Sequence, residues 1–223
     1  MRFPDRLLKG YTAFLGGRLR EEQSRYQSLA EKGQSPEIMV VGCCDSRVSP
    51  EVIFDARPGE LFVVRNVANI VPPYEPDGHA HGVSAALEFG VAALKVKHIV
   101  VLGHAQCGGV RAFAEDAEPL SPGDFIGSWM KLMAPAMNKV GPRGSLSPMD
   151  YLRTLEQANI INSLDNLMTF PRLAKLVQGG DIAIHGAYFG VATGALSVCT
   201  RENTDFVPVA QAEHAKVLAG PRF

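Results

Sequence analysis

Short apolar runs, separated by longer stretches with helical spacing, divide most of the chain into alternating segments. Four of these runs have the length and composition of buried strands, namely residues 37–42, 60–65, 97–103 and 181–189. A fifth run, residues 195–199, follows Thr193-Gly194 and could return beside the fourth run through a tight turn. We therefore expect a sheet built from these five strands.

Helical patterns fill the intervals between the apolar runs. Apolar residues recur with helical spacing over Val83–Leu94, which predicts a helix there. A longer helix is predicted over residues 148–170, with Ser147 as its N-cap and Pro171 as its end. We also expect a helix near residues 123–140, flanked by loops rich in Pro, Gly and Ser. Strands that alternate with helices imply an α/β domain whose central, mostly parallel β-sheet is flanked by helices.

The N-terminal segment has a pattern of its own. Its first part has an apolar face at helical spacing, made of Leu7, Leu8, Tyr11, Phe14 and Leu15. Gly16-Gly17 separates this helix from a second, mostly polar helix over residues 18–32. The segment could pack on its own domain or on a second subunit, and the pattern does not decide between them. We expect a helical arm, residues 1–33, and one α/β domain, residues 34–223.

The composition is that of an ordinary globular protein. Of the 223 residues, 46% are hydrophobic and 20% are charged, which argues against a disordered chain. The formal net charge of −1 gives the chain no general attraction to nucleic acid or to an anionic membrane. No apolar run approaches the roughly 18 residues of a spanning helix, and the first residues lack the apolar stretch of a signal peptide. We therefore expect a cytoplasmic protein without nucleic-acid or membrane partners.

The chemistry of the chain is concentrated where two of the apolar runs end. The first run leads into Cys43-Cys44, and the third leads into His104 and Cys107. Ligands of open α/β sheets bind at the carboxyl ends of the strands, so adjacent strands would bring Cys43, His104 and Cys107 together. Two thiolates and an imidazole are a natural donor set for Zn²⁺. Two alternatives stay open: Cys44 could replace Cys43 as the ligand, or all of these cysteines could be buried side chains without a metal.

Three protein ligands leave one position of a tetrahedral metal site to be filled. Asp45 is the local candidate for a fourth ligand, which would close the site. Arg47 could instead hold the Asp45 carboxylate in a bidentate pair, which would keep it ionised and turned away from the metal. Asp45 could then accept a hydrogen bond from a metal-bound hydroxide and direct its lone pair at a substrate. A further possibility is that the pair only shapes the turn.

Three motifs together resemble those of the β-class carbonic anhydrases. They are Cys43-x-Asp45-Ser46-Arg47, Phe62-Val-Val-Arg65-Asn66-Val67-Ala68-Asn69, and Gly103-His104-x-x-Cys107-Gly108-Gly109. The similarity continues through residues 156–167 and 184–189, so it covers most of residues 30–200. It implies a carbonate dehydratase, a zinc lyase that interconverts CO₂ and bicarbonate by attack of a zinc-bound hydroxide on CO₂.

The resemblance also implies roles for individual residues. Cys43, His104 and Cys107 match the ligands of one zinc ion per chain, and Asp45 with Arg47 matches the catalytic pair. The substrate-binding residues that it implies are Gln34, Phe62, Val67, Phe89 and the backbone N–H of Gly108. Because two thiolates neutralise the zinc charge, we expect a weaker Lewis acid than with three histidines, and activity that rises into the alkaline range.

Gln34 and Val40 place the resemblance in the plant-like branch of the family. The other branch has a Trp three residues before the first zinc cysteine, where this chain has Val40. In the plant-like branch the apolar pocket lies at a dimer interface. The resemblance therefore implies a homo-oligomer with the dimer as its smallest active unit and a tetramer as a possibility. It also implies a site that is open at neutral pH and that bicarbonate does not close.

Other functions remain compatible with parts of the pattern. An enzyme of the same fold that hydrolyses a CO₂ analogue such as carbon disulfide would use identical ligands. A structural-zinc interaction module would need a fourth Cys or His ligand, and none is nearby in the sequence. Redox chemistry by Cys43-Cys44 lacks the Cys-x-x-Cys spacing, although a disulfide between these two residues would destroy the metal site.

Overall fold

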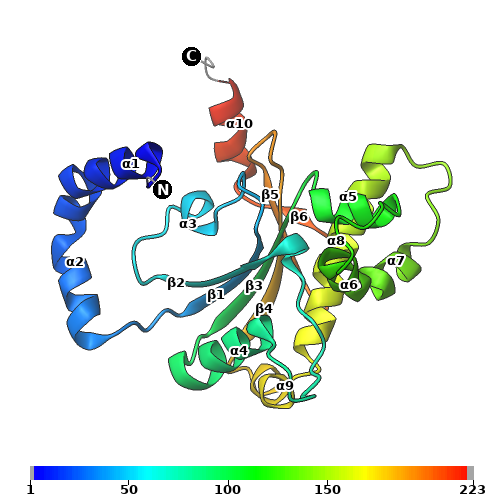
Figure 1. The fold of residues 1–223 in the computed structure, drawn as a ribbon, viewed down its shortest axis with the longest axis horizontal. Helices are drawn as coiled ribbons and strands as arrows, with labels where there is room; N and C mark the ends of the chain where they lie inside the picture. Colours follow the sequence, from blue (N-terminus) through cyan, green and yellow to red (C-terminus); the bar gives the residue numbers. More distant parts are fainter. Residues whose placement is uncertain (1–2, 220–223) are drawn as a thin grey trace.

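A mixed β-sheet forms the centre of the protein, which the computed structural model describes from residue 3 to residue 219 (Figure 1). Within that range the strands are β1 (Ile38–Cys43), β2 (Leu61–Asn66), β3 (His98–His104), β4 (Ala183–Phe189), β5 (Leu196–Thr200) and β6 (Val207–Pro208). Their spatial order is β2-β1-β3-β4-β5-β6. The first four run parallel, and β5 and β6 are each antiparallel to the preceding strand. The predicted fold class and all five predicted strands are confirmed, whereas β6 has no counterpart in the prediction.

Helices pack against the sheet on its faces and at its carboxyl end. Those that follow the N-terminal arm among the described residues are α3 (Pro50–Ile53), α4 (Gly82–Glu88), α5 (Gly108–Ala114), α6 (Phe125–Met130), α7 (Ala134–Val140), α8 (Pro148–Leu167), α9 (Pro171–Gln178) and α10 (Gln211–Ala219). One hydrophobic cluster packs α4, α8 and α9 against the strands, with Met39, Ile99 and Ile160 fully buried in it. A second cluster includes Cys43 and Cys107, where α5, α6 and α8 meet the carboxyl ends of β1 and β3. No helix among the described residues is long and apolar enough to cross a bilayer.

Two of the helical predictions need correction. The helix predicted over residues 148–170 ends at Leu167, and Pro171 begins α9 instead of ending α8. Proline is well tolerated in the first turn of a helix, where the missing N–H would have no partner. The helix predicted near residues 123–140 is divided into α6, a 3₁₀ turn and α7. Pro135, in the first turn of α7, cannot donate the hydrogen bond that would continue the preceding helix.

The N-terminal arm forms α1 (Asp5–Gly16) and α2 (Arg18–Lys32), as predicted. α2 packs on its own domain at the segment before β2, where the Arg25 guanidinium donates to the Pro58 carbonyl at 2.6 Å. Within the described chain no residue of α1 is buried, and Leu7 and Tyr11 keep 55% and 60% of their surface exposed. The apolar face of α1 is therefore uncovered.

Candidate metal centre and active site

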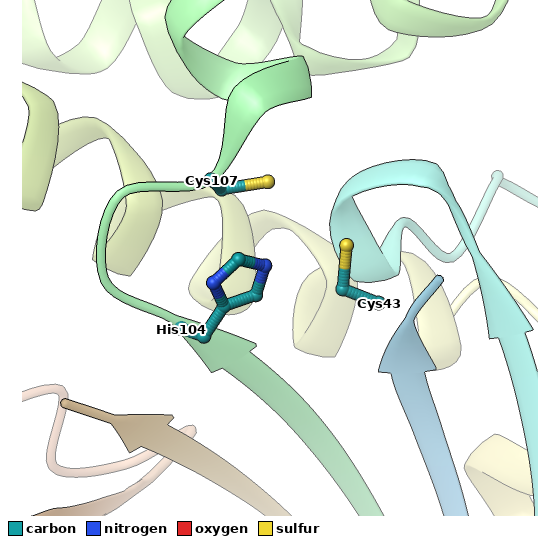
Figure 2. A group of neighbouring side chains, drawn as sticks. All are labelled: Cys43, His104 and Cys107. Atoms are coloured by element: carbon teal, nitrogen blue, oxygen red, sulfur yellow. The ribbon is translucent and has the colours of Figure 1, made fainter. Parts of the chain in front are cut away.

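Cys43, His104 and Cys107 meet at the carboxyl end of the sheet. β1 ends at Cys43, the parallel strand β3 beside it ends at His104, and Cys107 directly precedes α5. All three side chains are buried, and their ligand atoms lie within 4.8 Å of one another. Figure 2 shows the two thiols and the imidazole directed into one common space. Among the described residues, no fourth Cys, His, Asp or Glu joins this group, which argues against a closed structural site.

The local chemistry of this cluster suits a metal ion. Nδ1 of His104 lies 2.9 Å from the Ala105 carbonyl oxygen, which can only accept, so Nδ1 carries the proton and Nε2 has a free lone pair. The buried Nε2 has no hydrogen-bond partner among the described residues, and a metal ion would satisfy it. A hydrogen bond between the two sulfurs lowers the pKa of Cys43 and raises that of Cys107. A cation bound between the two sulfurs would favour the thiolate form of both.

Arg47 holds the Asp45 carboxylate beside the cluster. Nε and Nη2 of Arg47 donate to Oδ1 and Oδ2 of Asp45 at 2.9 and 2.7 Å, and the Arg47 backbone N–H adds a bond of 3.0 Å. These bonds, the side-chain ones above all, hold the pKa of Asp45 well below its usual range. Oδ2 of Asp45 lies 3.8 Å from Nε2 of His104. The bidentate pair expected from the sequence is present, and the ionised carboxylate lies next to the candidate metal ligands.

Arg65 stabilises the loop that follows β1, a role that the sequence does not reveal. Its guanidinium donates to three carbonyl groups of that loop, those of Cys43, Asp45 and Val48, at 2.8, 2.7 and 2.7 Å. These partners lie 17 to 22 residues away along the chain. The only sequence signal for Arg65 is its place in the second of the three motifs.

Val67 and Gly108 lie beside the cluster. Gly108 begins α5 directly after Cys107, so its N–H belongs to the first turn, where backbone N–H groups have no partner within the helix. Val67 follows β2, and its Cγ1 packs against the start of α5. A Cβ atom added at Gly109 would lie only 2.8 Å from that methyl group. Gly108 therefore adjoins a candidate metal ligand, and Val67 packs on the hydrophobic cluster that contains Cys43 and Cys107.

Gln34, Phe62 and Phe89 lie away from the cluster of their own chain. Gln34 precedes β1, whereas Cys43 is the last residue of that strand. Phe62 stands in β2 four residues before Asn66, the strand partner of Cys43, which corresponds to roughly 13 Å along the strand. The rings of Phe62 and Phe89 have their centroids 5.9 Å apart. Within one chain, these three residues do not line the space around the metal ligands.

Comparison with known proteins identifies the family. A family model described as carbonic anhydrase matches residues 38–196. Beta carbonic anhydrase 3 of Arabidopsis thaliana is 36% identical over 197 residues, which cover 87% of this chain and 76% of that protein. The chain belongs to the β-class carbonic anhydrase family. Beta carbonic anhydrase 5, chloroplastic, of the same plant is 34% identical over 83% of this chain, and the aligned part is 61% of that protein.

Solved structures of β-carbonic anhydrases share the fold. The β-carbonic anhydrase CcaA has a TM-score of 0.85 and 29% identity, with 92% of this chain and 91% of that chain covered. A chain from the two tetrameric β-carbonic anhydrases of Sordaria macrospora has a TM-score of 0.74 and 28% identity, covering 87% of this chain and 95% of its own. The interpretation of the sequence as a carbonic anhydrase is confirmed.

Proposed function

We propose that this β-carbonic anhydrase interconverts CO₂ and bicarbonate with a zinc ion held by Cys43, His104 and Cys107. Two sulfur donors and one imidazole favour Zn²⁺ over cations that prefer oxygen ligands. The unpartnered Nε2 of His104 and the closeness of all three ligand atoms, which lie within 4.8 Å of one another, support this assignment. Zinc bound there would acidify a water molecule and make hydroxide available near neutral pH.

The position of Asp45 is the observation that supports the proposal most directly. Its Oδ2 lies 3.8 Å from Nε2 of His104, while Arg47 keeps the carboxylate ionised. A carboxylate in this place can accept a hydrogen bond from the attacking hydroxyl group and so turn its lone pair toward CO₂. The N–H of Gly108 can donate to the oxygen on which negative charge develops. CO₂ itself is uncharged, so an apolar neighbour such as Val67 is sufficient to hold it.

Stopped-flow CO₂ hydration, with zinc content measured in parallel, tests this proposal. We expect one zinc per chain and rapid hydration in the wild type, and a loss of at least about 100-fold in kcat/KM for Asp45→Ala without loss of zinc. Asp205→Ala, which removes an exposed carboxylate elsewhere, serves as the matched control and should retain wild-type activity. Zinc-loaded wild type without hydration activity, or an Asp45→Ala variant with wild-type activity, would refute the proposal.

We also propose that two copies of the chain complete each active site. The apolar face of α1 is uncovered in the single chain. Gln34, Phe62 and Phe89 lie too far from their own cluster to contact its substrate. A second copy could cover α1 and bring its own three residues to the site, which makes the homodimer the smallest active unit and allows a tetramer. The Sordaria macrospora enzymes are described as tetrameric.

The oligomer proposal can be tested at α1. Tyr11→Glu places a charge on the exposed apolar face and should shift the protein toward monomers in light scattering, with parallel loss of CO₂ hydration. Leu120→Glu changes an even more exposed apolar side chain, which belongs to a loop, and is the control. A Tyr11→Glu protein that is monomeric and fully active would contradict the shared site.

We also propose that the protein belongs to the plant-like branch of the family. Val40 stands where the other branch has Trp, and the Arg47 guanidinium donates to both oxygens of the Asp45 carboxylate. We therefore expect activity at neutral pH that added bicarbonate does not abolish beyond simple product inhibition. A bicarbonate-dependent loss of activity with Asp45 bound to the metal would exclude this branch. The cytoplasmic location stays a prediction.

A further inference from the structure

Helix α8 turns a row of polar side chains toward the loops of the metal centre. The row consists of Glu156, Asn159, Ser163 and Asn166, whose spacing of three, four and three residues places them on one helical face. Asn159 donates to the Ala68 carbonyl at 2.7 Å, and the Ser163 hydroxyl accepts from the Val71 N–H at 3.1 Å. Buried polar side chains are costly unless they are bonded, so this row has a specific purpose in the fold. Asn159, Ser163 and Asn166 hold the segment that follows β2.

The side chains of α8 contact two loops, the segment after β2 and the turn between His104 and Cys107. Both loops contain residues in unfavourable backbone conformations. Ala68 and Asn69, after β2, have φ values of 64° and 47°, and Gln106, between two metal ligands, has φ 58°. These are left-handed conformations that residues other than glycine adopt at a cost, so the surroundings must impose them. The bonds from α8 to the first loop provide that constraint for Ala68 and Asn69. The turn at Gln106 needs a constraint of its own.

Glu156 supplies this constraint. Its side chain is 97% buried, since only 3% of the residue surface is exposed. Oε1 accepts a hydrogen bond from the Cys107 backbone N–H at 2.8 Å, and Oε2 accepts one from the Tyr188 hydroxyl at 2.7 Å. Tyr188 belongs to β4 and is also buried. One carboxyl group therefore connects α8 and β4 to the residue after Gln106.

We propose that Glu156 is a positioning residue for the metal centre. By accepting from the Cys107 N–H, it holds the turn between His104 and Cys107 in the conformation that directs the Cys107 sulfur at its fellow ligands. Glu156 contacts neither the ligand atoms nor the space for substrate, so it acts through Cys107. This inference rests on the proposed function, because it concerns zinc held by the same cluster.

Four variants separate the hydrogen bond from general packing. Glu156→Gln keeps the shape and an oxygen that can accept from the Cys107 N–H, whereas Glu156→Met keeps the length and loses the acceptor. Tyr188→Phe removes only the second hydrogen bond. Asn162→Leu is the matched control, because Asn162 is a buried polar residue of α8 whose partner is the Leu132 carbonyl at 3.3 Å, outside both loops.

Zinc affinity, measured by competition with a chromogenic chelator, is the main readout. We expect Glu156→Met to bind zinc about 10- to 100-fold more weakly than the wild type. Glu156→Gln should stay within about three-fold, and Tyr188→Phe should lose roughly three- to ten-fold, as expected for one indirect hydrogen bond. The thiolate-to-metal absorption of the Co²⁺-substituted protein should change in Glu156→Met and not in Asn162→Leu.

Three results would overturn the proposal. The first is wild-type zinc affinity in Glu156→Met, or in Tyr188→Phe if Glu156→Met does not fold. The second is an equal loss in Asn162→Leu, which would make the effect one of packing. The third is a loss in Glu156→Gln as large as in Glu156→Met, which would assign the effect to charge instead of the hydrogen bond. Wild-type CO₂ hydration is measured separately, so a zinc-binding protein without hydration would refute the proposed function and leave the role of Glu156 standing.

Discussion

The close approach of α8 to the sheet depends on glycines in two neighbouring strands. A Cβ atom at Gly103 in β3 would lie 2.7 Å from Cδ1 and 2.8 Å from Cγ1 of Ile160. A Cβ atom at Gly186 in β4 would lie 2.8 Å from Cγ2 of the same side chain. Ile160 is fully buried within the hydrophobic cluster, so its side chain can move only by displacing its packed neighbours. We therefore expect Gly103→Ala to push α8 away from the sheet and to destabilise the protein.

The loss of stability expected for Gly103→Ala follows from these distances. Carbon atoms in good contact are about 3.5–4.0 Å apart, so Ile160 or the helix must move by about 0.7 Å or more. Overpacking of this kind costs about 1–3 kcal/mol. Ile160→Ala alone removes a fully buried side chain and should cost about 2–5 kcal/mol. In the double variant the new methyl group occupies part of the space that Ile160 leaves, so its loss should fall short of the sum by about 1–2 kcal/mol.

Urea unfolding of the wild type, both single variants and the double variant measures this coupling. Protein concentration and zinc excess must be equal in all samples, because ligand binding and assembly both shift apparent stability. Gly82→Ala is the matched control, since a Cβ atom there meets nothing within 4 Å. Losses that add within about 0.5 kcal/mol, or a Gly103→Ala protein as stable as the control, would refute the argument that Gly103 sets the position of α8.

Two further predictions concern the Asp45–Arg47 pair. Arg47→Lys keeps the charge but not the planar fork that binds both carboxylate oxygens, so kcat/KM should fall about 10- to 100-fold at unchanged zinc content; a wild-type rate would exclude a role for the bidentate geometry. Because folding lowers the pKa of Asp45, the ionised carboxylate contributes stability that is fully present above its unfolded pKa of about 4 and is lost as the pH falls toward the folded value. The difference in unfolding free energy between wild type and Asp45→Asn should therefore be constant from neutral to mildly acidic pH and shrink below about pH 4, and a difference that grows on acidification would contradict this sign.

Elements with a strong local signal could be predicted from the sequence. The central strands are uninterrupted apolar runs, and Ser147 caps α8 as expected, with its hydroxyl accepting from the Asp150 N–H at 3.1 Å. Elements with an ambiguous or short signal could not. Pro171 is compatible with the end of one helix and with the start of the next, and β6 has only two residues, too few for any periodicity.

By itself, the sequence predicted the candidate metal ligands and their meeting point. Cys43, His104 and Cys107 follow two apolar runs, parallel strands end at the same edge of a sheet, and the three motifs resemble those of the family. The choice between Cys43 and Cys44 came from the structure, in which Cys43 joins the group and Cys44 is exposed. Only the tertiary structure decided which groups support that centre. The Glu156 carboxylate accepts from the Cys107 N–H across 49 residues of sequence, and Phe62 lies far along β2 from the ligands although it begins one of the three motifs. These distances and contacts depend on how α8 and the strands pack in three dimensions. The spacing of residues along one chain does not predict that packing.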